Sequence, residues 1–156
     1  MSINPMYIFQ RNERYDGVRR INIYLLRLLY VLMFFVLGRE TWLHILTHQG
    51  PWDPNEAVAW CVWTAFATLA GIGIIHPVKM LPIVLLEIFY KVLWLGLVAY
   101  PLWSHGTLAG SSAEGTTAAF LWVPLPIVAV PWGYVLTNYF WKPKKVEVVR
   151  PALKVA

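Results

Sequence analysis

Arg27, Glu87 and Lys91 are ionisable residues that lie well inside long apolar stretches of the sequence. An ionisable side chain within the hydrocarbon of a bilayer costs roughly 3 kcal/mol or more, so it needs a partner. Lys91 follows Glu87 by four residues, which places both on one face of a helix. Arg27 is eight residues beyond Arg19 and Glu87 is eight beyond Lys79, which gives the two side chains a matching depth of roughly 12 Å. We therefore expect Arg27, Glu87 and Lys91 to form one intramembrane charge cluster.

This charge cluster has two interpretations. The simpler one is a structural clamp between two helices, in which Arg27 can also reach the headgroups and Lys91 can lean along its helix. The alternative is functional: an ion or proton step, or a site for an anionic lipid or a quinone-like headgroup. Two cations and one anion leave a positive charge that a ligand carboxylate or phosphate would neutralise. The cofactor is therefore unknown, and the alternatives are no cofactor, a lipid or a quinone-like ligand.

A second group of residues with chemical potential consists of Glu40, His44 and His48. They follow each other at four-residue spacing, so they share one face if the helix continues that far. Histidine and carboxylate side chains are good ligands for zinc or another divalent ion. The pattern is not HExxH, and no cysteine pair supports it, so a polar belt at the membrane interface is the simpler interpretation. A metal site is kept as an alternative.

No catalytic residue is assigned from motifs. The sequence has no Ser–His–Asp arrangement, glycine-rich phosphate loop or nucleotide-binding motif. Cys61 is the one cysteine, which excludes an intrachain disulfide and a multi-cysteine metal site. It stands in an apolar stretch, where a small buried residue is its expected role.

The composition indicates that these residues are positioned by membrane-spanning helices. The chain of 156 residues is 58% hydrophobic and 13% charged, with a mean hydropathy of +0.54. A soluble domain carries about 25% charged residues, and one of this size could not bury so much apolar surface. The net charge of +5 does not indicate nucleic acid, because the basic residues flank apolar stretches rather than forming a basic helix or an aromatic platform. Nucleic acid is therefore not an expected partner.

We predict an all-α fold: a polytopic membrane protein built as a four-transmembrane-helix bundle. Four apolar stretches are long enough to cross about 30 Å of hydrocarbon, and they lack the alternation of a transmembrane barrel. Three prolines should kink or locally open the fourth helix: Pro124, Pro126 and Pro131. The predicted parts are a basic N-terminal segment at 1–20, a transmembrane domain at 21–141 with spans at about 21–46, 57–75, 80–103 and 117–141, and a basic tail at 142–156.

The distribution of basic residues predicts the orientation. Ten Lys and Arg residues fall in the N-terminal segment, the turn near Lys79 and the C-terminal tail, whereas the two other loops contain none. Cytoplasmic segments of membrane proteins carry the excess of Lys and Arg, so both termini are expected in the cytoplasm. The expected location is the plasma membrane, or the inner membrane if the protein is bacterial, with anionic headgroups facing the basic side.

Three functions are compatible with this sequence. The leading prediction is a non-catalytic structural, accessory or assembly subunit of a membrane complex, packed against other membrane subunits or a second copy. The first alternative is a small oligomeric transporter or channel that uses Arg27, Glu87 and Lys91. The second is a membrane enzyme or metal-binding protein with an outer-side site at Glu40, His44 and His48.

Overall fold

The computed structural model describes residues 8–141, and the predicted C-terminal tail with its basic residues lies outside this range. The described part of the protein is mostly helical, as predicted. Three helices are long and apolar enough to cross a membrane, at Arg20–Thr47, Pro54–Ile75 and Leu81–Ser104. The predicted fourth span is a pair of helices, Glu114–Ala129 and Trp132–Trp141, bent by 72° at a short break. The described chain thus has three helices that are long and apolar enough to span a membrane, or up to four if the bent pair is one span.

The long helices are continuous but contain segments of π-helix. The first consists of α1 (Arg20–Leu32), the π-segment η3 (Met33–Leu37) and α2 (Gly38–Thr47). The second is α3 (Pro54–Ile75), and the third consists of α4 (Leu81–Trp94), the π-segment η4 (Leu95–Ala99) and α5 (Tyr100–Ser104). The bent pair consists of α6 (Glu114–Phe120), α7 (Pro124–Ala129), α8 (Trp132–Val135) and the π-segment η5 (Leu136–Trp141).

The helix boundaries have clear local causes. Pro54 stands in the first turn of α3, where its missing N–H is not needed. The Asp53 carboxylate caps the same helix by accepting bonds from the N–H groups of Asn55 and Glu56. The bend in the fourth segment falls at Val130, which has extended backbone because the following Pro131 disfavours helix there. The expected kink is thus present, and it is a full break.

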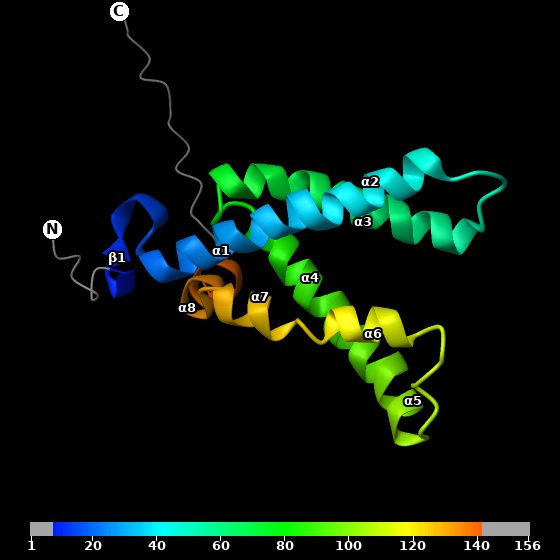
Figure 1. Cartoon of the computed structure of the whole chain (residues 1–156). Coiled ribbons are helices and arrows are strands. Elements are labelled where there is room, and N and C mark those ends of the chain that lie inside the picture. Colours follow the sequence, from blue (N-terminus) through cyan, green and yellow to red (C-terminus); the bar gives the residue numbers. More distant parts are fainter. Residues whose placement is uncertain (1–7, 142–156) are drawn as a thin grey trace, which may run out of the picture.

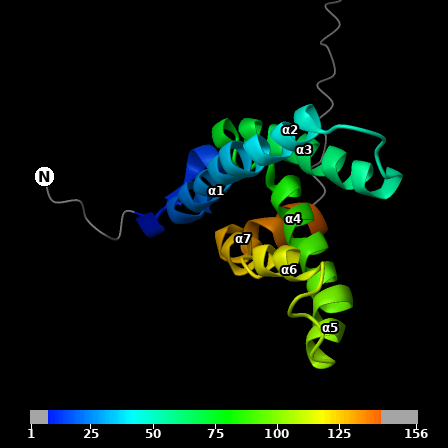
Figure 2. The same ribbon diagram turned by 45° about the vertical axis from the view of Figure 1, so that its right-hand side comes forward.

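The helices form two antiparallel hairpins that diverge from one end of the molecule (Figure 1). The first arm consists of α1, α2 and α3, and the second consists of α4 and α5 with α6 and α7 beside them. The main contacts between the arms join α1 to α7 and α3 to α4. Figure 2 shows the same divergence after rotation, with the tips of the two arms far apart. The arrangement is therefore a two-armed structure rather than a compact parallel bundle.

The apolar core lies where the two arms meet. It includes Leu26, Tyr30, Leu81 and Val84, which are fully buried. Tyr30 reaches α3 because Gly73 has no side chain; a Cβ there would approach the Tyr30 ring to 2.6 Å. By contrast, many large apolar side chains along both arms are exposed, as expected of surfaces that face lipid or another membrane helix.

The two arms meet at a basic end, which carries the arginines of the N-terminal segment and the turn with Lys79 (Figure 1). Residues 11–19 form a small hairpin in which β1 (Arg11–Asn12) pairs antiparallel with β2 (Val18–Arg19). A 3-10 turn, η2 (Glu13–Tyr15), follows β1. Asp16 and Gly17 both have positive φ angles, a conformation favoured by Asp-Gly turns. This hairpin was not predicted from the sequence.

Candidate functional site

The buried ion pair of Glu87 and Lys91 is the polar centre of the core. Glu87 lies on α4 and is 5% exposed, and Lys91 Nζ donates a bond of 2.6 Å to its Oε1. Lys91 Nζ also lies 5.7 Å from the centre of the Phe120 ring on α6, a cation–π distance. The pair predicted from helical spacing is therefore present, and it faces α6 as well as its own helix.

The second oxygen of Glu87 is unusual. Glu87 Oε2 is buried and has no hydrogen-bond partner among residues 8–141. The Tyr30 hydroxyl is committed elsewhere, since it donates to the carbonyl of Pro77 at 3.1 Å. A buried carboxylate oxygen without a donor is costly, so this atom is the best candidate for a proton or ligand contact in the core.

Arg27 is not joined to this ion pair. Its guanidinium donates to the hydroxyl of Tyr15 at 2.8 Å and lies 5.9 Å from the centre of the same ring. Within the described part of the chain, no ion pair links Arg27 to Glu87. Its Nε is buried without a hydrogen-bond partner among these residues. Arg27 instead joins α1 to the 3-10 turn that precedes it. The matching depth of Arg27 and Glu87 along their helices therefore did not bring Arg27 into contact with Glu87 and Lys91.

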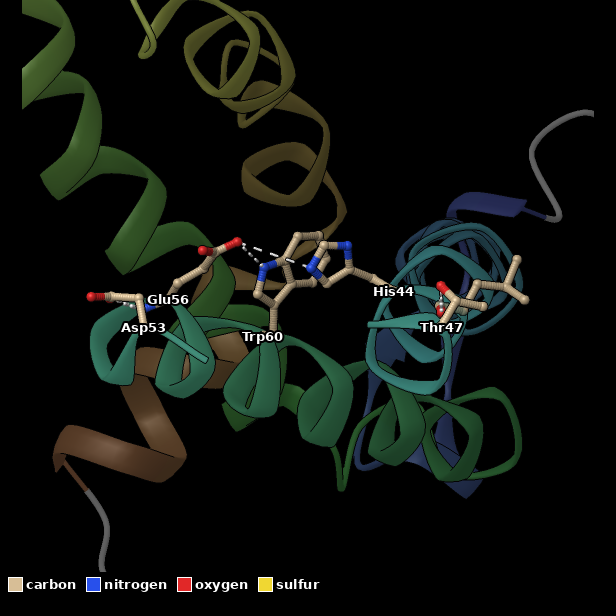
Figure 3. Close-up of polar contacts among 6 residues, drawn as sticks. His44, Thr47, Asp53, Glu56 and Trp60 are labelled. Atoms are coloured by element: carbon tan, nitrogen blue, oxygen red, sulfur yellow. Dashed lines mark hydrogen bonds and ion pairs between the residues drawn. The ribbon is translucent and has the colours of Figure 1, made fainter. Parts of the chain in front are cut away.

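The histidines of the second predicted group stack on tryptophans, as Figure 3 shows for His44 and Trp60. The His44 ring lies 3.7 Å from that of Trp60 on α3, and the His48 ring lies 3.5 Å from that of Trp52. The Trp60 indole also donates to Glu56 Oε1 at 3.2 Å, and His44 Nε2 lies 4.0 Å from the same oxygen. These contacts hold the tip of the first arm together.

The geometry of this tip does not favour a metal. Among residues 8–141, no group of three or more His, Cys, Asp and Glu side chains is placed to share one ion. Glu40 is exposed, and the stacked imidazoles face indole rings rather than a common point. The sequence spacing identified His44 and His48 correctly as one helical face, but Trp52 and Trp60 were missed as their partners because they come from the next loop and helix.

Sequence reasoning also missed an open cavity of about 550 Å³ at the basic end. Its walls include Arg11 and Arg19, which the sequence suggested only as markers of orientation. They come together with residues of the fourth apolar segment, more than a hundred positions later, because the N-terminal hairpin folds against the break at Pro131. The sequence shows that Arg11 and Arg19 are both basic. Only the hairpin, which was not predicted, places their side chains next to each other.

Comparison of the chain with protein-family models, curated proteins and solved structures finds no match.

Proposed function

We propose that this protein is a non-catalytic accessory or assembly subunit of a membrane complex. In this proposal the bent pair counts as the fourth span, and both termini lie in the cytoplasm of a cell whose plasma membrane holds the protein. The basic end then faces the anionic headgroups of the inner leaflet, in agreement with the positive-inside rule.

The observation that supports this role is the divergence of the two arms. The principal contacts between them are confined to α1 with α7 and α3 with α4, near the basic end. Farther along, exposed apolar side chains line both arms: Val62 on α3 is 50% exposed and Leu97 in η4 is 73% exposed. A partner's membrane-spanning helix, about 10 Å across, would pack against both arms at once. Packing of this kind drives helix association in lipid.

The polar groups of the core fit the same role. Glu87 and Lys91 neutralise each other within α4, and Trp94 Nε1 on the same helix donates to Thr117 Oγ1 on α6 at 3.3 Å. On the first arm, Trp42 Nε1 donates to Thr68 Oγ1 at 3.0 Å. Each arm is thus tied internally by a Trp–Thr bond, which keeps it a rigid surface on which a partner can dock.

Site-specific photocrosslinking in native membranes tests this function. A photoreactive residue at Val62 and one at Leu97 should each capture a protein, and the captured protein should be the same for both arms. Phe140 is 74% exposed but lies near the basic end, so it serves as the matched control and should not capture that protein. Capture of lipid alone from both arms, or of unrelated proteins from each, would contradict an assembly role.

A small transporter or channel is the second candidate, and the unpaired Glu87 Oε2 is the observation that favours it. A buried carboxylate with a free acceptor oxygen can take up a proton or contact a cation. Vesicles containing the purified protein would then show ion flux that Glu87→Gln abolishes. Glu40→Gln, at an exposed position, is the matched control and should leave the flux unchanged.

A further inference from the structure

The open cavity at the basic end has the form of a binding site. It lies between the β1–β2 hairpin, the beginning of α1 and the break before α8. Val18 and Val130 are 3% and 2% exposed and give it an apolar floor. Arg11 and Arg19 stand on the hairpin side, and Thr137 contributes from the opposite wall. The cavity therefore combines a small apolar base with a cationic rim.

The two arginines are placed opposite each other by the strand register. Arg11 and Arg19 are direct partners across the β1–β2 ladder, so their side chains lie on the same face of it. Like charges in this position repel and destabilise a two-stranded ladder. Among residues 8–141, neither arginine has an ion-pair partner. An anion between them would convert the repulsion into two attractions.

Several other polar groups of the cavity are held by bonds within the protein. Asp16 is the acidic residue that lines the cavity, and its Oδ2 accepts a bond of 3.3 Å from the Tyr134 hydroxyl. The Asn22 amide donates to the carbonyl of Ala129 at 3.1 Å, and the Asn138 amide donates to that of Tyr134 at 3.0 Å. These bonds fix the walls, and the guanidinium groups of Arg11 and Arg19 are the charged donors that line the cavity.

We infer that this cavity binds a phosphate group, which Arg11 and Arg19 hold together from the hairpin side. The guanidinium fork matches phosphate oxygens with two parallel hydrogen bonds, and such charge-assisted bonds are strong. Trp132, which also lines the cavity, is an interfacial residue type, and phospholipid phosphates are abundant at that depth. The phosphate of an anionic phospholipid is one source and a soluble phosphate compound is the other. The inference does not depend on the assembly role proposed above.

Native mass spectrometry of the detergent-purified full chain, titrated with phosphatidylglycerol, tests this inference. Arg11→Gln and Arg19→Gln should each weaken lipid retention about tenfold, because each removes one charged donor. Arg14→Gln is the matched control: it makes the same change of charge in the same segment, but Arg14 lies outside the cavity. Thr137→Phe should also reduce retention, because it fills the cavity without altering the charge.

Inorganic phosphate alone, added as a competitor, separates the two sources. Displacement of the lipid at equal concentration would support the cavity with soluble phosphate as the source, whereas lack of displacement would support a lipid ligand. Equal weakening by Arg14→Gln and Arg11→Gln would overturn the inference, because it would show diffuse attraction to the basic end. Unchanged retention in both cavity arginine variants would overturn it as well. Far-UV circular dichroism of each variant confirms that the chain is folded.

Discussion

At the scale of single residues, tight contacts and buried charges determine how the helices fit. Gly73 accepts the Tyr30 ring, and the buried carboxylate of Glu87 depends on Lys91 for its one observed hydrogen bond within the described chain. Both features depend on atoms that a small substitution would change. They therefore give the most direct tests of packing.

Gly73→Ala should destabilise the first arm. The added Cβ would lie 2.6–2.7 Å from Tyr30 ring atoms, so the fully buried ring must shift. Overpacking of this kind costs about 1–3 kcal/mol. Thermal unfolding in detergent should show a clearly lower midpoint temperature for Gly73→Ala than for the unchanged protein. Gly96→Ala is the control, because a Cβ there meets no atom within 4 Å, and a similar loss in both variants would contradict the packing.

Lys91→Met should destabilise the protein more than replacement of both members of the ion pair. The single change leaves Glu87 buried and without its partner, which costs about 3–5 kcal/mol, whereas the double variant Glu87→Met/Lys91→Met removes both charges. Chemical unfolding of the two single variants and the double variant forms a complete cycle. If the double variant lost as much stability as the sum of the single variants, the two residues would not be coupled.

At the scale of elements, the helical hairpins follow from apolar length, whereas their breaks follow from proline. The first three helices begin and end within a few residues of the predicted bounds, because their limits are set by local signals such as Asp53 and Pro54. The break at Val130 and Pro131 was expected only as a kink. The bend of 72° exceeds a kink, because Pro131 holds Val130 in extended backbone and so interrupts the helix completely.

Pro131→Ala should straighten the fourth segment. Alanine restores an N–H group and lifts the restriction on Val130, so residues 130–132 can become helical. Spin labels at Leu121 and Tyr139, both exposed, should move apart in a Cys61→Ser background, as measured by pulsed electron paramagnetic resonance. Pro124→Ala is the control because Pro124 occupies the first turn of α7, where proline is tolerated. An unchanged distance in Pro131→Ala would show that tertiary contacts alone hold the bend.

At the scale of the whole molecule, composition predicted the class of protein but not its shape. The length of the apolar stretches and the scarcity of charges predicted long apolar helices. The structure confirms three helices that are each long and apolar enough to cross a membrane. The divergence of the arms was not predictable, because exposed side chains such as Leu97 and buried ones such as Val84 are equally apolar. In lipid, hydropathy does not distinguish a surface that faces lipid from one that faces a helix.

The same limit applies to the candidate site. Helical spacing correctly paired Glu87 with Lys91, because both lie on one helix and their distance is a local property. It failed for Arg27, whose partner Tyr15 belongs to a turn that precedes the helix. Depth along a helix gives one coordinate of a side chain, whereas a contact also requires the direction in which it points.

The most direct test of the account is the topology of the chain in intact cells. With Cys61→Ser as background, single cysteines at Gln49, His76, Ser112 and Ala156 would be treated with a membrane-impermeant maleimide. Four spans with both ends in the cytoplasm predict labelling at Gln49 and Ser112, and protection at His76 and Ala156 until the membrane is permeabilised. Labelling of Ala156 in intact cells would contradict the account, because the bent pair would then fail to return the chain to the cytoplasm.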